Sequence, residues 1–229
     1  MEGRTVDQVV ILAGGLGTRL GSISEKIPKS LVEVAGRPIL SHILGWASTQ
    51  GCRAGLILTG HLGEQFDDYR PDCDIDLSFH QEPHPLGTGG ALWNARELLE
   101  DRFVLLWGDD LHMVNYPRLL ETHISSGCDL TITVTGRHSS FNLKHERGRV
   151  VRYDKHLTMP SGLNGYEAGT SIVQKSLLEA HGRDDAWSWE EVVYPSMSGL
   201  IAAHLDDAPF WDIGTPEGLA LLESFLKEG

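Results

Sequence analysis

One glycine-rich segment of this 229-residue sequence combines features that suit the binding of phosphate. It runs from residue 12 to residue 20 and reads Leu-Ala-Gly-Gly-Leu-Gly-Thr-Arg-Leu. Its glycines allow backbone amides to approach phosphate oxygens without a Cβ clash. Arg19 adds a forked, permanent positive charge, and Lys29 follows as a second cation. The segment therefore predicts a phosphate-binding turn, although the glycine spacing alone also fits a tight structural turn.

A second group consists of carboxylates that follow short apolar or aromatic runs. Asp109 comes after Trp107-Gly108, and Asp212 comes after Phe210-Trp211. Ligands bind at the carboxyl ends of strands in open α/β sheets, so we expect Asp109 to lie near the glycine-rich turn. Mg²⁺ prefers one or two carboxylates together with substrate phosphates and water, so Asp109 and Asp212 predict a Mg²⁺ site. Each aspartate alone also fits a turn or helix cap, and Asp110 is an alternative ligand to Asp109.

A third group, residues 82–91, reads Glu-Pro-His-Pro-Leu-Gly-Thr-Gly-Gly-Ala. The pattern predicts a turn that passes into a helix, with glycine and threonine at the helix start leaving backbone amides free for a ligand. An ordinary helix N-terminus is the alternative. Neither GxGxxG leading directly into a helix nor GxxxxGK[ST] occurs, which weakens a dinucleotide-binding fold and a P-loop.

The elements that must position these groups alternate between strand and helix along the chain. Short apolar runs predict buried strands, and apolar residues at helical spacing predict the helices between them. The alternation predicts βαβ units in an α/β fold with a mostly parallel sheet. A polar stretch, 137–169, is expected to form a hairpin excursion at one sheet edge, within a single domain spanning 1–229. The expected strands are 9–12, 54–59, 75–79, 103–107, 129–134, 169–173 and 200–204, and the expected helices 38–50, 89–99, 116–125, 175–180 and 216–226.

Composition excludes several classes of partner. The chain has 32 acidic and 19 basic residues and a formal net charge of −13, which argues against nucleic acid or an anionic membrane as partner. Its three cysteines are far apart, so neither a disulfide framework nor a zinc site is indicated. No apolar run approaches the roughly 18 residues of a membrane helix, and no signal pattern begins the chain. We expect a cytoplasmic protein.

The glycine-rich segment, followed by Ile-Pro-Lys-Ser-Leu at 27–31, resembles the signature of the nucleotidyltransferases that activate sugar 1-phosphates. Ser30 departs from the usual Pro-Lys-Pro of that family. The resemblance implies a Rossmann-like nucleotidyltransferase fold with helices on both sheet faces, a nucleoside triphosphate and a sugar 1-phosphate as substrates, and Mg²⁺ bound by Asp109 and Asp212. It implies that Arg19, Lys29 and Asp109 act in catalysis. The residues implied to bind the nucleotide are Leu12, Ala13, Gly14, Gly15, Gly17, Thr18, Arg19, Glu82, Gly87, Thr88 and Asp109.

The sugar side of the site is carried by weaker similarities. Asp154-Lys155-His156 resembles the family's Glu-Lys-Pro, which implies that Lys155 contacts the sugar phosphate in catalysis, together with Lys29, and that Asp154 contacts a sugar hydroxyl. A solvated hairpin is the alternative, since the proline is missing and the acid is shorter. Gly169 resembles a glycine whose backbone lies under the sugar, and Glu190 resembles the acid of a Phe-Ser-x-Glu pattern in the same pocket.

Among family members without additional domains, the chain looks most like heptose 1-phosphate guanylyltransferases. GTP and heptose 1-phosphate are therefore the expected substrates. Mannose 1-phosphate guanylyltransferases and other sugar-1-phosphate uridylyl- or thymidylyltransferases are alternatives. A non-catalytic nucleotide-sugar binding protein is an alternative of another class. Relatives often form dimers, so a homodimer is one assembly that the resemblance implies.

Overall fold

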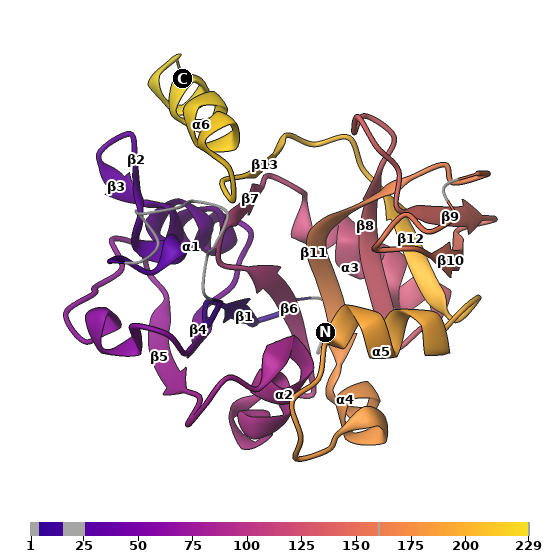
Figure 1. The fold of residues 1–229 in the computed structure, drawn as a ribbon, viewed down its shortest axis with the longest axis horizontal. Coiled ribbons are helices and arrows are strands. Elements are labelled where there is room, and N and C mark those ends of the chain that lie inside the picture. The colour runs from indigo at the N-terminus through magenta and orange to yellow at the C-terminus, as the bar shows by residue number, and fades with distance from the viewer. Residues whose placement is uncertain (1–4, 16–25, 160, 229) are drawn as a thin grey trace.

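The computed structural model describes residues 5–15, 26–159 and 161–228, and its centre is a nine-stranded sheet (Figure 1). Short apolar runs such as Gln8–Leu12 form the inner strands, as the sequence predicts. In spatial order the strands are β5 (Asp76–Gln81), β4 (Ala54–Thr59), β1 (Gln8–Leu12), β6 (Arg102–Trp107), β11 (Tyr166–Gln174), β8 (Leu130–Thr135), β12 (Ile201–Leu205), β10 (Arg149–Tyr153) and β9 (Leu143–Glu146).

The sheet is mixed rather than uniformly parallel. Strands β5, β4, β1 and β6 pair in parallel, as do β8 and β12, whereas β11 is antiparallel to both of its neighbours. The β9–β10 hairpin forms one edge of the sheet, and β10 pairs antiparallel with β12. This hairpin reverses the chain, so β10 and β11 run against the direction that the other strands share. The expectation of a mostly parallel sheet is therefore met by strand direction, since all strands of the sheet except β10 and β11 point the same way. Only half of the neighbouring strand pairs are parallel.

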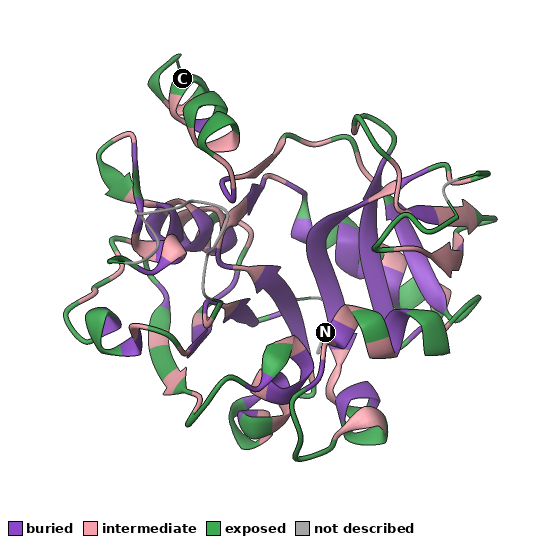
Figure 2. Ribbon diagram, viewed as in Figure 1, coloured by how far each residue is buried: buried purple, intermediate pink, exposed green. Residues whose placement is uncertain are grey.

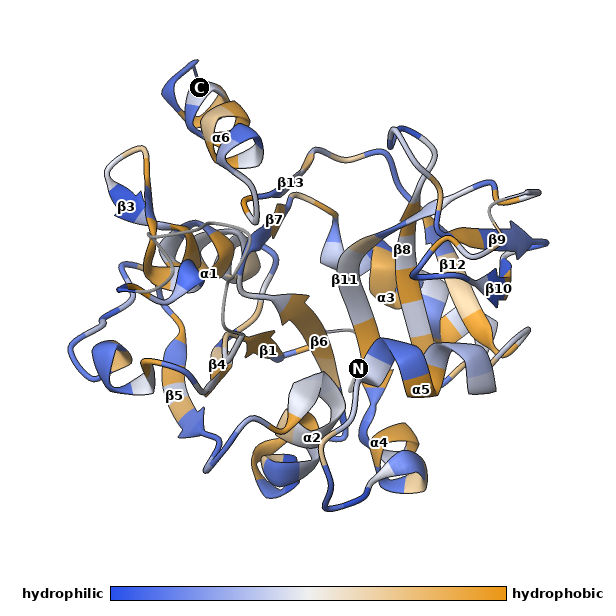
Figure 3. Ribbon diagram, viewed as in Figure 1, coloured by the Kyte–Doolittle hydropathy of each residue, from blue (hydrophilic) through white to orange (hydrophobic). Residues whose placement is uncertain are grey.

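Helices cover both faces of the sheet, and the strands alternate their side chains between them. Val9 and Ile11 of β1 pack into one apolar cluster and Val10 into the other. The first cluster includes residues of α1 (Ile39–Thr49), α3 (Tyr116–Ser126) and α6 (Pro216–Glu228). The second includes residues of α2 (Gly87–Asn94), α4 (Lys175–His181) and α5 (Trp189–Ser196). Figure 2 shows the buried sheet between these layers, and Figure 3 shows its apolar strands.

Smaller elements complete the fold. Strands β7 (Asp110–His112) and β13 (Phe210–Asp212) form an antiparallel pair, and β2 (Glu33–Val34) pairs with β3 (Arg37–Pro38). In the described ranges, the 3₁₀ helices η2 (Lys29–Leu31), η3 (Gly63–Phe66) and η4 (Arg96–Leu98) lie in connections. The helix predicted over 89–99 is divided into α2 and η4, and α5 and the β7–β13 pair were not predicted. Among the described residues, no helix is both long enough and apolar enough to cross a membrane.

Candidate functional site

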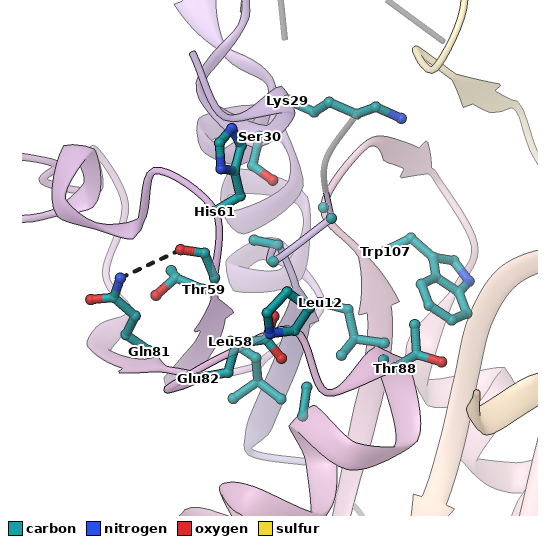
Figure 4. Close-up of a pocket in the computed structure, with 18 of the residues that line it drawn as sticks. Leu12, Lys29, Ser30, Leu58, Thr59, His61, Gln81, Glu82, Thr88 and Trp107 are labelled. Carbon is teal, nitrogen blue, oxygen red and sulfur yellow. Dashed lines mark hydrogen bonds between the residues drawn. The ribbon is translucent and has the colours of Figure 1, made fainter. Parts of the chain in front are cut away.

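A cavity of about 500 Å³ lies at the carboxyl ends of β1, β4, β5 and β6 (Figure 4). Strand ends of this kind converge at one edge of an open α/β sheet, which is where such folds bind ligands. The residues that line the cavity include Leu12, Ala13, Gly14, Gly15, Lys29, Ser30, Thr59, His61, Gln81, Glu82, Gly87, Thr88, Trp107 and Asp109. The structure thus brings residues of the glycine-rich segment and of the 82–91 segment together with Lys29 and Asp109. Gly17, Thr18 and Arg19 lie outside the described residues.

The floor of the cavity requires small residues because backbone segments cross there. The Gly108 amide donates to the Leu12 carbonyl at 2.9 Å, and a Cβ at Gly108 would collide with the Ser30 hydroxyl. Ser30 is only 2% exposed, so the residue that departs from the family pattern fills the space beside Gly108. The turn that follows β1 is therefore held in place by its packing against the end of β6.

Glu82 places a carboxylate across the cavity from Lys29. Its Oε2 accepts a hydrogen bond from the Leu86 amide at 3.0 Å, while Oε1 faces Gly14 and Gly60. A Cβ on Gly14 would lie 3.1 Å from that oxygen. Burial raises the pKa of Glu82, and the hydrogen bond from Leu86 opposes the rise. The carboxylate is thus held in one orientation beside the glycine-rich turn.

Lys29 and Asp109 form an ion pair at the edge of the cavity. The Lys29 Nζ lies 2.8 Å from Asp109 Oδ2, and the two side chains are 14% and 22% exposed. Lys29 opens the 3₁₀ helix η2, and Asp109 follows the end of β6. Two residues 80 positions apart, both predicted to act in catalysis, therefore lie in direct contact.

Further carboxylates gather behind this ion pair. Asp110 and Asp212 are opposite each other in the β7–β13 ladder, and the Ile213 amide donates to the Asp109 carbonyl at 2.9 Å. Burial raises the pKa of Asp110 well above its usual value, and Asp109, Asp212 and Glu167 raise it further. No three acidic, histidine or cysteine residues of the described ranges form a closed metal site. This concentration of carboxyl groups near one lysine nevertheless fits a divalent cation that takes one or two carboxylates and completes its shell with substrate.

Apart from Lys29, the predicted sugar-side residues lie outside the lining of this cavity. Lys155 Nζ is 3.1 Å from Glu190 Oε2, so these two predicted residues form an ion pair. Gly169 has a φ of +76°, and a Cβ at this position would collide with the carboxylate of Asp110 and crowd the Trp107 ring. Gly169 thereby lies beside the carboxylate cluster.

Asp154 has a local role. Its carboxylate accepts hydrogen bonds from the Thr158 amide at 2.9 Å, the Thr158 hydroxyl at 3.1 Å and the Met159 amide at 2.7 Å. These contacts, led by the Met159 amide, lower the pKa of Asp154. The Asp154 carboxylate therefore stabilises the loop that follows it. These hydrogen bonds compete with the predicted contact between Asp154 and a sugar hydroxyl.

Glu167 belongs to this region, although sequence reasoning gave it no role. Its side chain is buried at 7% exposure, and its Oε1 accepts a hydrogen bond from the Gly169 amide at 2.9 Å. Burial, with a smaller contribution from Glu190, raises its pKa to about 8, while the hydrogen bond from the Gly169 amide and the charge of Lys155 oppose the rise. The available signal was an acid inside a strand that is otherwise buried. Its place between Lys155 and Asp110 appears only in three dimensions.

The start of α2 differs from expectation. The amides of Gly89 and Gly90 donate to the Trp187 carbonyl at 3.0 and 3.4 Å, and the Thr88 Oγ1 accepts from the Trp189 amide at 2.8 Å. The expectation that glycine and threonine leave the helix-start amides free for a ligand is therefore wrong for Gly89 and Gly90. Their partners come from a segment about 100 residues downstream, which local sequence does not reveal. Gly87, with a φ of +70°, and Thr88 still line the cavity.

Comparison with known proteins bears on this geometry. A family model described as nucleotidyl transferase matches residues 8–145. The D-glycero-alpha-D-manno-heptose 1-phosphate guanylyltransferase of Aneurinibacillus thermoaerophilus is 29% identical over 225 residues, which cover 92% of this chain and 94% of that relative. A mannose-1-phosphate guanylyltransferase of Mycobacterium tuberculosis is 28% identical over 232 residues, and the match spans 96% of this chain but 64% of that protein.

The structural comparison agrees with these matches. The crystal structure of HddC from Yersinia pseudotuberculosis superposes with a TM-score of 0.80 at 29% identity, and the match covers 96% of this chain and 100% of HddC. HddC complexed with GMP-PN matches equally well. UDP-glucose pyrophosphorylase from Acinetobacter baumannii, at 16% identity and a TM-score of 0.76, shares the fold.

Proposed function

We propose that this chain, which belongs to the nucleotidyl transferase family, transfers a nucleotidyl group from GTP to heptose 1-phosphate and releases pyrophosphate. The predicted enzyme class, a sugar-1-phosphate nucleotidyltransferase, is confirmed by the family match together with the guanylyltransferase relatives. The observation that carries the proposal is the cavity at the strand ends, with the glycine turn and Glu82 on one side and the Lys29–Asp109 pair at its edge.

In the proposed reaction, a phosphate oxygen of the sugar 1-phosphate attacks the α-phosphorus of the nucleotide. A new P–O bond forms there, and the bond from the α-phosphorus to the oxygen that bridges to the β-phosphate breaks. Pyrophosphate leaves with that electron pair. The protein has little covalent work to do, so positioning and neutralisation of charge supply most of the effect. Lys29 lies at the cavity edge and serves the nucleotide phosphates, and we assign Arg19 the same role.

Lys155 is the cation that we assign to the sugar phosphate. It has two acidic neighbours, Glu190 at 3.1 Å and Glu191 at 3.7 Å, and its side chain is 36% exposed. An incoming phosphate can therefore reach the ammonium group of Lys155, which is already accessible from solvent. The Gly169 amide donates to Glu167, and Gly169 also lies beside Asp110, which suits a backbone position under the sugar.

Asp109 and Asp212 would hold a Mg²⁺ ion. Bound there with substrate, Mg²⁺ would neutralise charge on the reacting phosphates. Asp109 is the better candidate of the adjacent pair, since it lines the cavity, whereas Asp110 is not among the lining residues. Lys29 would then hold Asp109 in place as well as serve the phosphates.

The preference for GTP rests on Glu82. The edge of guanine presents two adjacent donors, N1–H and the N2 amino group, and a carboxylate can accept from both. Glu82 lines the cavity with its orientation fixed by Leu86. The GMP-PN complex of HddC and the guanylyltransferase activity named for the relatives support the same base. Mannose 1-phosphate is the second candidate acceptor, favoured by the mannose-1-phosphate guanylyltransferase relatives.

A pyrophosphate-release screen tests the proposal. GTP, ATP, CTP, UTP and dTTP would each be combined with heptose, mannose, glucose and N-acetylglucosamine 1-phosphates in the presence of Mg²⁺. We expect the highest kcat/KM for GTP with heptose 1-phosphate. A higher value with mannose 1-phosphate would select the second candidate. Release with no pair would contradict the proposal and favour a nucleotide-sugar binding protein.

Location, domain organisation and assembly stay predictions. All three cysteines are free, which agrees with a reducing compartment such as the cytoplasm. We retain a single domain over 1–229, with 137–169 as its sugar-side excursion. A homodimer would be detected by light scattering of the purified protein.

A further inference from the structure

One short segment, residues 187–190, contacts both halves of the site. On the nucleotide side, the Trp187 amide donates to the Leu86 carbonyl at 2.9 Å, and the Gly89 amide donates to the Trp187 carbonyl at 3.0 Å. The Trp189 amide donates to the Thr88 Oγ1 at 2.8 Å. On the sugar side, the next residue, Glu190, holds Lys155 at 3.1 Å. The segment therefore joins the start of α2 to Lys155.

Packing makes this connection stiff. Trp189 is fully buried and Trp187 is 5% exposed, and the Trp187 ring lies against Gly89 so closely that a Cβ there would collide with it. Glu190 has a side chain that is only 13% exposed, so its ion pair with Lys155 is less screened than one in open solvent. A shift at the start of α2 would consequently move Glu190, and with it Lys155.

Thr88 is the residue through which the nucleotide cavity can act on this connection. It lines the cavity, and Figure 4 shows its side chain on the opposite side from Gln81 and Glu82. Its hydroxyl oxygen accepts from the Trp189 amide, and a hydroxyl that accepts one hydrogen bond can still donate its own proton. The same group can therefore donate to a nucleotide and hold the first residue of α5.

We propose that Thr88 is a positioning residue that links the nucleotide cavity to Lys155 through Trp189 and Glu190. The inference rests on the proposed function, in which Lys155 binds the sugar phosphate. The nucleotide and the sugar phosphate are then not bound independently, because both depend on the Thr88 hydroxyl.

Kinetics of Thr88→Val and Thr88→Ser test the link. Valine keeps the shape but removes the acceptor for the Trp189 amide, whereas serine keeps it. We expect T88V to raise the KM for the sugar 1-phosphate about fivefold, the effect of losing one hydrogen bond. T88S should restore that KM. In the Glu190→Ala background T88V should change the sugar-phosphate KM no further, because the connection is already broken. A rise in the nucleotide KM alone, or independent effects of T88V and E190A, would overturn the proposal.

Hydrogen exchange gives a readout that does not need turnover. T88V should speed amide exchange in peptides covering 186–191 and also in those covering 152–157, and T88S should not. A merely local role would change only the first region and would overturn the proposal. E190A, at the partly exposed end of the connection, should change 152–157 by itself, which tests the link if T88V does not fold. Wild-type protein without turnover would refute the proposed function, while the exchange pattern would still decide the link.

Discussion

At the scale of single residues, the Lys29–Asp109 pair concentrates the charge on which the proposed reaction depends. Lys29→Ala removes the cation beside the nucleotide phosphates and leaves a 22% exposed carboxylate without its partner. We expect kcat to fall by about 10²-fold or more, the typical cost of one preorganised electrostatic contact. Steady-state pyrophosphate release measures the effect. Lys144→Ala is the matched control, since Lys144 forms an exposed ion pair with Glu146 in strand β9. Full turnover by K29A would refute the assignment.

Glu82 is the residue that should choose the base. Glu82→Gln keeps the size of the side chain but replaces one acceptor by a donor, so it can no longer accept from both guanine groups. We expect kcat/KM for GTP to fall about 10- to 100-fold relative to UTP, in line with the ~1–3 kcal/mol that one bidentate base contact contributes to discrimination. Parallel assays with the two nucleotides measure the ratio. Glu64→Gln, at an exposed position of the 3₁₀ helix η3, should leave this ratio unchanged.

At the scale of elements, the parts that follow from local sequence are the strands and helices whose apolar pattern is continuous. β4 matches its prediction residue for residue, and α1 and α3 lie within one residue of theirs at each end. α5 was missed because it is only eight residues long and contains Pro195, although Trp189, Val192 and Val193 have helical spacing. The three-residue strands β7 and β13 depend on each other for their hydrogen bonds, so neither leaves a signal of its own.

Helix α2 gives a test of how tightly the elements around the site pack. Gly89→Ala would place a methyl group against the Trp187 ring, so we expect the free energy of unfolding to fall by about 1–3 kcal/mol, as for other overpacking substitutions. Urea denaturation measures the change. Gly45→Ala in α1 is the matched control, because nothing lies within 4 Å of its added Cβ. That variant should gain up to ~1 kcal/mol from the higher helix propensity of alanine. Equal effects of the two substitutions would contradict the packing argument.

At the scale of the whole molecule, the two halves of the site differed in how far the sequence could predict them. The glycine turn and Asp109 lie at strand ends that apolar runs identify, and the structure collects them with Lys29 in one cavity. The sugar half depends on contacts that no local pattern reveals. Lys155 and Glu190 form an ion pair although they are 35 positions apart in the sequence. Glu167 comes close to the carboxylate cluster only when β11 packs beside it. Gly17, Thr18 and Arg19 stay predictions.

Burial of Glu167 should make the stability of the molecule depend on pH. Its pKa in the folded protein is about 8, above the usual 4.5 of the unfolded chain, so between these values the folded state holds a proton that the unfolded state has released. The free energy of unfolding must therefore fall as pH rises through this window. Buried His112 and His123, whose pKa values are lowered to about 4, contribute in the opposite sense, but only below about pH 6.5.

Between pH 6.5 and 8 these histidines no longer contribute, and a comparison of the wild type with a Glu167 variant separates Glu167 from Asp110, whose pKa is also raised. We expect urea denaturation of the wild-type protein to give a free energy of unfolding that declines over this range, by at most ~1.4 kcal/mol per pH unit for one group. Glu167→Gln removes the ionisable group, so the free energy of unfolding of this variant should decline less. The stability of the variant relative to the wild type should therefore increase as pH rises. Glu121→Gln, on the exposed surface of α3, should follow the wild type. Parallel curves for the wild type and E167Q would show that Glu167 is already ionised in the folded protein at pH 6.5.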